Sequence, residues 1–280
     1  MSEVINGRAL AEEVLSSAKQ KFQKIERKVT LSIIRIGDDQ ASLIYIRNKE
    51  AAAEKLGVEV KKNHFPKETE FNKVSALIDE LNADESVDGI LLQLPLPEHI
   101  NPRLLIDRIL PEKDVDGLTS INQGKLFVSD DSGIRPCTPM GVLYMIKSIC
   151  NNISGMYAVV LGRSATVGRP MAQLLLRENC TVSIAHSCSK NLPDICRQGD
   201  IVVSAVGCPL FVKADWIKEG AIVIDVGINR DQNNKIIGDV DFLPISRVAR
   251  AISPVPGGVG PMTVAYLMHN VVAAASERYE

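Results

Sequence analysis

Two side chains that can take part in proton transfer stand four residues apart near the start of the chain. Tyr45 and Lys49 lie within residues 41–56, whose apolar spacing predicts a helix. Residues at this spacing share one helix face, so a phenol and an amine can meet the same ligand. From spacing alone, two ordinary surface residues are the commoner interpretation. The pair is therefore a candidate for acid–base chemistry that its surroundings must support.

Gln93 is a second candidate, because it ends an apolar strand predicted at residues 89–93 and is followed by Pro95 and Pro97. Ligands of open α/β sheets collect at the carboxyl ends of the strands, where this amide would lie. A bond to a neighbouring loop is an equally good interpretation of the same residue.

Asp114 and Asp116 form a third candidate, in the sequence Lys113-Asp114-Val115-Asp116-Gly117. Two carboxylates before a glycine fit an Asx turn. They fit equally well a group that accepts hydrogen bonds from the donor edge of a ligand ring. The spacing leaves both interpretations open.

A glycine loop follows in the second half of the chain. Gly162 comes directly after an apolar strand predicted at 157–161, and Gly168 opens a helix predicted at 168–177. Gly162 permits a tight turn, Gly168 lets the helix approach the sheet, and the free N–H groups at the helix start can face a phosphate. The spacing departs from G-x-G-x-x-G, so an ordinary strand-to-helix turn is the alternative.

Short-chain dehydrogenases also carry a tyrosine and a lysine four residues apart, but after their glycine loop. In this chain Tyr45 and Lys49 precede the loop by more than a hundred residues, which argues against that family.

The strand after this loop indicates which dinucleotide would bind. NAD sites usually carry an acidic residue about 20 positions beyond the loop, where it bonds the ribose hydroxyls. Residues 184–190 contain no acid, whereas Arg163 and Ser187 are placed to hold a 2′-phosphate. The sequence therefore favours NADP.

The composition excludes several classes of protein. The 280 residues include 32 basic and 34 acidic side chains and are 45% hydrophobic, which excludes a disordered chain and leaves no basic excess for nucleic acid. No stretch reaches the ~18 apolar residues of a membrane helix, and the first residues lack the layout of a secretion signal or transit peptide. Six cysteines without a C-x-x-C pair indicate reduced thiols in a cytoplasmic protein, and the four histidines are too scattered for a metal site.

The elements that must position these groups alternate along the chain. Apolar periods predict helices at 7–27, 41–56, 72–81 and 168–177, and strands at 30–36, 58–64, 89–93, 157–161, 181–185, 201–205 and 221–226. A further helix is expected to begin at Thr138 and Pro139, with Thr138 as its N-cap. The stiff loop 254–261 precedes a last helix. We therefore expect two α/β domains with mainly parallel sheets.

Together and in this order, these motifs resemble the bifunctional methylenetetrahydrofolate dehydrogenase/methenyltetrahydrofolate cyclohydrolases, the FolD family. The resemblance covers essentially the whole chain, and its most specific segment is PVPGGVGPMT at residues 254–263. The other matching segments are 45–49, 89–97, 113–117, 136–139, 162–164, 224–229 and 238–240.

The resemblance implies a folate-binding catalytic domain over residues 1–138 plus the C-terminal helix 262–280, and a Rossmann-type NADP domain over residues 139–261. Substrate would lie in the cleft between the two domains. The implied partners are tetrahydrofolate one-carbon derivatives and a second copy in a homodimer, with no nucleic acid, membrane or metal.

The resemblance also implies a role for individual residues. Lys49 would be the catalytic lysine, supported by Gln93, while Tyr45 packs on the folate and Asp116 holds the pterin. The residues that fall where the family binds NADP are Gly162, Arg163, Ser164, Ser187 and Ile228. Pro256 and Gly257 would line the substrate site. The chain departs from the usual family residues at Ala165-Thr166, Ala185 and Ser253, none of which belongs to the implied catalytic set.

The implied activity is the NADP-dependent oxidation of 5,10-methylenetetrahydrofolate and the hydrolysis of the methenyl product to 10-formyltetrahydrofolate, in one-carbon metabolism. Hydride transfer depends mainly on positioning, whereas hydrolysis needs proton transfer, and a cationic substrate would lower the pKa of Lys49. A dehydrogenase without hydrolase activity and a cofactor-binding protein without turnover are the alternatives. The presence of Lys49, Tyr45 and Gln93 argues against both. A formyltetrahydrofolate synthetase would need an ATP site, and the chain has no G-x-x-x-x-G-K-[ST] stretch.

Overall fold

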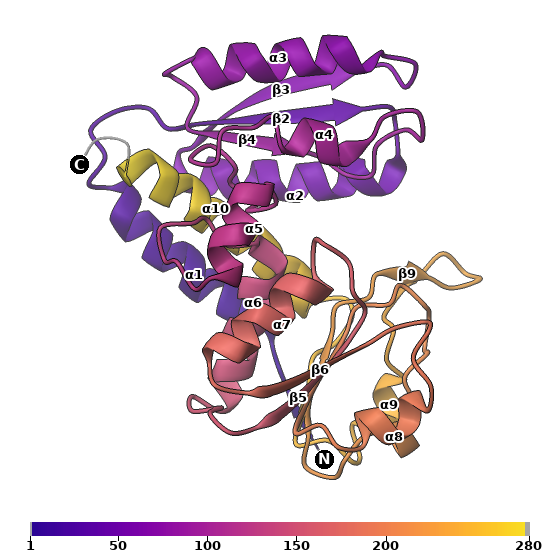
Figure 1. Cartoon of the computed structure of the whole chain (residues 1–280). Helices are drawn as coiled ribbons and strands as arrows, with labels where there is room; N and C mark the ends of the chain where they lie inside the picture. The colour runs from indigo at the N-terminus through magenta and orange to yellow at the C-terminus, as the bar shows by residue number, and fades with distance from the viewer. Residues whose placement is uncertain (1, 278–280) are drawn as a thin grey trace. The chain divides into compact units, whose positions relative to one another are not determined.

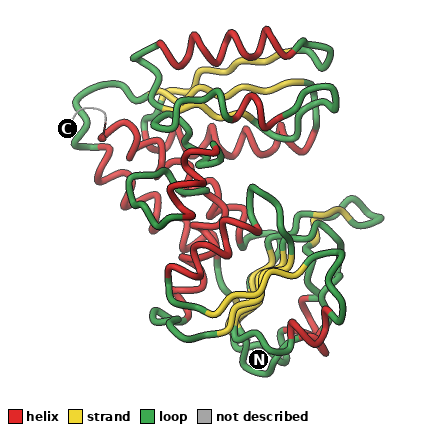
Figure 2. Tube along the Cα trace, in the orientation of Figure 1, coloured by secondary structure: helices red, strands yellow, loops and turns green. Residues whose placement is uncertain are grey.

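The chain forms two compact α/β units, each named here for its larger sheet (Figure 1). The computed structural model describes residues 2–277, without the side chains of residues 40–42 and 277. The three-stranded unit comprises Glu13–Cys137 and Val264–Glu280, and the six-stranded unit comprises Met1–Glu12 and Thr138–Thr263. In both units helices lie on the two sides of the strands, which confirms the fold class expected from the sequence (Figure 2).

The three-stranded unit is a parallel sheet in the order β3-β2-β4. Helix α2 covers one face of the sheet, and α3 and α4 cover the other (Figure 1). Strand β4 is buried along its whole length, because helices lie on both faces of the sheet and its side chains are small or aliphatic. The elements are β2 (Thr30–Ile36), α2 (Gln40–Leu56), β3 (Glu59–Phe65), α3 (Phe71–Ala83), β4 (Gly89–Leu92), α4 (Pro102–Ile106) and α5 (Ser120–Phe127).

A short segment without regular structure runs beside β4 and extends its ladder. The backbone N–H of Ile90 donates to the carbonyl oxygen of Lys113 at 2.8 Å, and Ile90 pairs with Asp114 in a parallel bridge. Residues 113–116 therefore run in the same direction as β4. This places Asp116 toward the carboxyl end of the strand, where Gln93 lies.

The six-stranded unit is an all-parallel sheet in the order β1-β11-β8-β7-β5-β6. Helix α7 lies on one face, and α8 and α9 lie on the other (Figure 1). The sheet strands are β1 (Glu3–Val4), β5 (Tyr157–Leu161), β6 (Thr181–Ala185), β7 (Ile201–Ser204), β8 (Ile222–Asp225) and β11 (Ala251–Ile252). The other elements are α7 (Gly168–Arg177), α8 (Leu192–Cys196), the 3₁₀ helix Ala214–Trp216, the hairpin β9 (Asn229–Arg230) with β10 (Ile236–Ile237), and α9 (Phe242–Ile245).

Three further helices contribute residues to both units: α1 (Gly7–Phe22), α6 (Cys137–Ile149) and α10 (Val259–Glu277). None of the helices in the described part of the chain is long and apolar enough to cross a membrane.

Three expectations about these elements differ from the structure. Helix α1 ends at Phe22 rather than at residue 27. The next turn is of the tighter 3₁₀ type, with a hydrogen bond from Lys24 N to Lys21 O, three residues back. Helix α6 already begins at Cys137, so Thr138 lies inside it and bonds Thr263 through its hydroxyl instead of capping. Residues 3–4, expected in the folate domain, lie in the six-stranded sheet, because β1 pairs with β11 there.

Candidate functional site

The predicted lysine and glutamine meet in the three-stranded unit. Lys49, on α2, donates from Nζ to Oε1 of Gln93 at 2.9 Å, just beyond the end of β4. Both side chains are buried, with exposed fractions of 9% and 8%. The amide of Gln93 also donates to the carbonyl oxygen of Leu94 at 2.7 Å. The Gln93 side chain thus bonds both the lysine and the loop that follows β4, which confirms the loop contact and leaves its role in a ligand site as a prediction.

Asp116 supplies the opposite charge beside this pair. Burial lowers the pKa of the Lys49 amine below its usual value, and the nearby Asp116 and Cys137 partly oppose that shift. Burial likewise raises the pKa of the Asp116 carboxyl, with Lys49 opposing. Burial thus moves the pKa values of this amine and this carboxyl toward each other, as is common for ionisable groups at catalytic sites. Tyr45, half-buried one turn before Lys49 on α2, shares its face of the helix.

The structure separates the two aspartates that spacing left ambiguous. Asp114 is the turn residue: its carboxylate accepts from the backbone N–H groups of residues 118 and 119 and from the Asn122 amide. Lys113 is fully buried and donates to three carbonyl oxygens at the carboxyl end of α3, each at 2.8 Å. These two residues anchor the segment, which leaves Asp116 as the carboxylate beside Lys49.

The glycine loop lies in the six-stranded unit at the end of β5, between β6 and β7, where the strand order reverses. Dinucleotides bind at this point in open α/β sheets. Gly162 has a φ of +111°, and a Cβ there would lie 2.3 Å from the carbonyl oxygen of Ala205, so only glycine fits. A Cβ on Gly168 would lie 2.2 Å from the oxygen of Gly162, so α7 begins in contact with the loop. The exposed Ser164 accepts at Oγ from the N–H groups of residues 167 and 168.

The other predicted NADP residues are exposed and lie at the carboxyl ends of the same strands. Arg163 follows β5, Ser187 follows β6 and Ile228 follows β8. The guanidinium of Arg163 reaches to 3.9 Å from the sulfur of Cys188, the residue beside Ser187. An open glycine turn, a following helix and an exposed arginine fit a phosphorylated dinucleotide.

Pro256 and Gly257, predicted to line the substrate site, lie in the six-stranded unit. They occupy the turn between β11 and α10, where Gly257 has a φ of +102°. They are thus placed in the unit of the glycine loop, whereas Lys49, Gln93 and Asp116 are brought together in the other unit.

Two buried carboxylates in the six-stranded unit were missed by sequence reasoning. Asp225 accepts from the N–H groups of residues 227, 239 and 240, each at 2.9 Å. Asp239 accepts from those of residues 206, 207 and 208 and from the Asn229 amide. Burial, with some help from Asp239, raises the pKa of Asp225 to about 7. Both lie in segments that matched the family, 224–229 and 238–240, and they fix the loops that follow β7 and β8.

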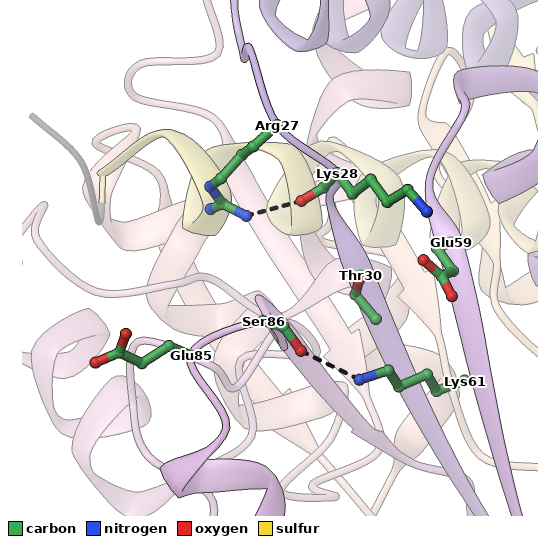
Figure 3. Close-up of a pocket in the computed structure, with 7 residues that line it drawn as sticks. All are labelled: Arg27, Lys28, Thr30, Glu59, Lys61, Glu85 and Ser86. Carbon is green, nitrogen blue, oxygen red and sulfur yellow. Dashed lines mark hydrogen bonds between the residues drawn. The ribbon is translucent and has the colours of Figure 1, made fainter.

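A separate hollow of about 560 Å³ opens at the amino-terminal ends of β2 and β3, away from Gln93 (Figure 3). Two of its three basic side chains have partners: Arg27 bonds the buried Asp88, and Lys61 bonds Asp84 and Ser86. No group of three or more potential metal ligands occurs among the described residues. We therefore assign these charges to holding the strand ends together.

Comparison with known proteins gives the family. Residues 5–116 match the tetrahydrofolate dehydrogenase/cyclohydrolase catalytic domain, and residues 136–279 match the NAD(P)-binding domain of the same family. The bifunctional protein FolD of Ehrlichia ruminantium (strain Gardel) is 48% identical over 280 residues, covering 97% of this chain and 93% of its own.

Solved structures agree with the sequence matches. The bifunctional FolD methylenetetrahydrofolate dehydrogenase/cyclohydrolase of Campylobacter jejuni superposes with a TM-score of 0.97 at 42% identity, covering 99% of this chain and all of its own. The Trypanosoma brucei enzyme, solved with NADP cofactor and an inhibitor, has a TM-score of 0.94 at 35% identity, covering 99% and 98%. With matches to both domains and to full-length relatives, the chain belongs to the tetrahydrofolate dehydrogenase/cyclohydrolase family.

Proposed function

We propose that this chain oxidises 5,10-methylenetetrahydrofolate to 5,10-methenyltetrahydrofolate with NADP and hydrolyses that product to 10-formyltetrahydrofolate. The observation that carries the proposal is the buried contact of Lys49 with Gln93, beside Asp116. An amine held in this way is suited to proton transfer, and hydrolysis is the half of the reaction that needs it. Family membership supports the same pair of reactions.

The first reaction depends on how the two ligands are held. When bound, NADP would supply the hydride acceptor for the oxidation of the one-carbon bridge of the folate. Gly162 and Ser164 would hold the pyrophosphate of NADP. Arg163 and Ser187 would bind its 2′-phosphate, and Ile228 would pack against the coenzyme. Tyr45 would stack on the folate, and Asp116 would accept hydrogen bonds from the pterin ring. Positioning accounts for most of the acceleration, because hydride transfer needs little acid–base help.

The second reaction uses the lysine. Water adds to the methenyl carbon, and the neutral Lys49 amine accepts the proton that this water loses. The bond from that carbon to the pterin nitrogen then breaks, and the proton of the new hydroxyl passes to the nitrogen as the formyl group forms. Burial and a cationic substrate both favour the neutral amine, while Gln93 keeps it directed at the site.

An absorbance assay of the purified protein tests the proposal directly. The protein is mixed with 5,10-methylenetetrahydrofolate and either NADP or NAD, and reduced coenzyme and the methenyl species are followed before and after acidification. We expect NADP-dependent reduction and accumulation of 10-formyltetrahydrofolate. Reduction that stops at the methenyl stage would contradict the hydrolase half, and no reduction with either coenzyme would contradict the whole assignment.

Asp116→Asn is expected to weaken folate binding. The amide lacks the charge that strengthens hydrogen bonds from the pterin donors, so we expect the KM for 5,10-methylenetetrahydrofolate to rise by about 10- to 100-fold. The KM for NADP should stay within about twofold, because that site is assigned to other residues. Steady-state kinetics with each substrate varied in turn measure both values, and an unchanged folate KM would refute the role of Asp116.

Arg163→Ala is expected to reduce the preference for NADP. Loss of a charge-assisted contact to the 2′-phosphate should raise the Kd for NADP by about 10- to 100-fold, while the Kd for NAD changes by less than about twofold. Isothermal titration of the purified protein with each coenzyme measures the two constants. Equal losses for NADP and NAD would instead assign Arg163 to the pyrophosphate.

We further propose that the protein is a cytoplasmic homodimer. All six cysteines are free, which is the usual state of thiols in a reducing compartment, and the family resemblance supports the dimer. Light scattering on a sizing column should give twice the mass of one chain.

A further inference from the structure

The side chain of Asn270 joins segments of the three-stranded unit that lie far apart in the sequence. It projects from α10, is 7% exposed, and donates from Nδ2 to the carbonyl oxygens of Val115 at 2.9 Å and Arg135 at 3.0 Å. The same nitrogen lies 3.4 Å from the sulfur of Cys137. One buried amide thus holds both the loop that carries Asp116 and the segment that leads into α6.

The carbonyl of Val115 is the point on which these contacts converge. It belongs to the peptide unit that joins Val115 to Asp116, so fixing its oxygen fixes the plane from which Asp116 departs. The thiol of Cys137 donates to the same oxygen at 3.3 Å. Burial and the charge of Asp116 raise the pKa of this thiol well above its usual value, which keeps it protonated and able to donate.

Gly117 shows how closely the two held backbones approach. A Cβ at this position would lie 2.5 Å from the carbonyl carbon of Arg135. Contact at Gly117 and the shared amide of Asn270 therefore fasten residues 115–117 against residues 135–137. Asp116 lies in the middle of the fastened loop.

We infer that Asn270 is a positioning residue for folate recognition, which acts through Val115 and Cys137 to set how Asp116 meets the pterin ring. The inference rests on the proposed function, because it takes Asp116 as the folate-binding carboxylate. Asn270 needs no contact with the substrate for this role. Removing its amide takes one donor from the buried carbonyl of Val115 and one from the partly buried carbonyl of Arg135, so the loop relaxes toward other partners. A shift of about 1 Å at a binding group can cost up to about 100-fold in rate.

Asn270→Leu removes the donors and keeps the size of the side chain. We expect the KM for 5,10-methylenetetrahydrofolate to rise by about tenfold while the KM for NADP stays within about twofold. The matched control is Asn63→Leu. The half-buried Asn63 on β3 also donates from Nδ2, to the hydroxyl of Ser32 on β2 at 2.8 Å, but it bonds neither the loop that carries Asp116 nor the segment that leads into α6. Its folate KM should equal that of the wild type.

A double-mutant cycle with Asp116→Asn separates positioning from general loss of structure. If Asn270 acts through Asp116, adding Asn270→Leu to Asp116→Asn should raise the folate KM by less than about twofold further. A full tenfold effect in that background, or a parallel rise in the KM for NADP, would overturn the inference. A wild-type protein without turnover would instead contradict the proposed function, so the two failures are distinguishable.

The second donor gives an independent test should Asn270→Leu fail to fold. Cys137→Ser retains a donor for the Val115 oxygen and for the Asp116 carboxyl, which the thiol also bonds, whereas Cys137→Ala removes both contacts with the loop. We expect the serine variant to keep the folate KM within about twofold and the alanine variant to raise it by about fivefold or more, the effect of one hydrogen bond of about 1 kcal/mol. Equal KM values for the two variants would contradict positioning through this carbonyl.

Discussion

Lys49→Met should abolish hydrolysis of 5,10-methenyltetrahydrofolate and affect the dehydrogenase rate much less. The variant keeps the buried volume of the side chain but has no amine to accept the proton of the attacking water. General acid–base groups contribute about 10²- to 10⁴-fold, and we expect a loss of that size in the hydrolase rate. The dehydrogenase rate should fall by less than about tenfold, because hydride transfer depends mainly on positioning. Separate assays with the methylene and methenyl substrates measure the two rates.

The pH dependence of hydrolysis should report the same group. The amine acts when neutral, so the wild-type rate should rise with pH up to the pKa of Lys49, which burial holds below its usual value. The Lys49→Met variant should show no such rise. Lys62→Met is the control, since this lysine on β3 is 67% exposed and pairs with Glu50 away from Gln93. Full hydrolysis by the Lys49 variant would remove the lysine from the mechanism.

Gly162→Ala should abolish productive NADP binding and destabilise the six-stranded unit. The new Cβ would lie 2.3 Å from the carbonyl oxygen of Ala205, at a φ of +111° that side chains rarely adopt. Strain of this kind costs about 1–3 kcal/mol, and the loop can escape it only by moving away from β7. We expect the Kd for NADP to rise by about 100-fold or more.

The glycine experiment has an internal standard. Hydrolysis of the methenyl substrate consumes no coenzyme, so the Gly162 variant should retain it and thereby show that the three-stranded unit is intact. Gly124→Ala is the matched substitution. Gly124 lies on helix α5, and a Cβ there would meet nothing within 4 Å. This change should therefore leave the NADP Kd unchanged, and it should leave the thermal midpoint unchanged or raise it slightly, because alanine favours a helix. Titration of NADP and thermal unfolding of both variants decide the matter; equal NADP affinities would show that the loop can relax.

Much of this fold could be predicted because its signals are local. Most of the longer parallel strands, though not β3, are rich in β-branched and aliphatic residues, and turn residues separate them from periodic helices. Strands β1 and β11 have two residues each, too few for any period to show. Their pairing depends on residues from opposite ends of the chain, which local patterns cannot relate.

The sequence indicates which residues are candidates for the site, but it does not show which of them contact one another. Spacing puts Tyr45 and Lys49 on one helix face, but only tertiary packing brings Lys49 to Gln93, 44 positions further along. The same limit applies to Lys113-Asp114-Val115-Asp116. The sequence does not show which of its three charged residues anchor the segment and which faces Lys49. Their burial and their partners in the fold make that distinction.

The pairing of β1 with β11 constrains how the protein can be made. A ribosome delivers residues 3–4 long before their partner strand at residues 251–252. The three-stranded unit, in turn, takes its final piece from Val264–Glu280. Each unit is therefore built from stretches of chain that the other unit interrupts, so the two units cannot fold one after the other in the domain-by-domain order usual for longer chains.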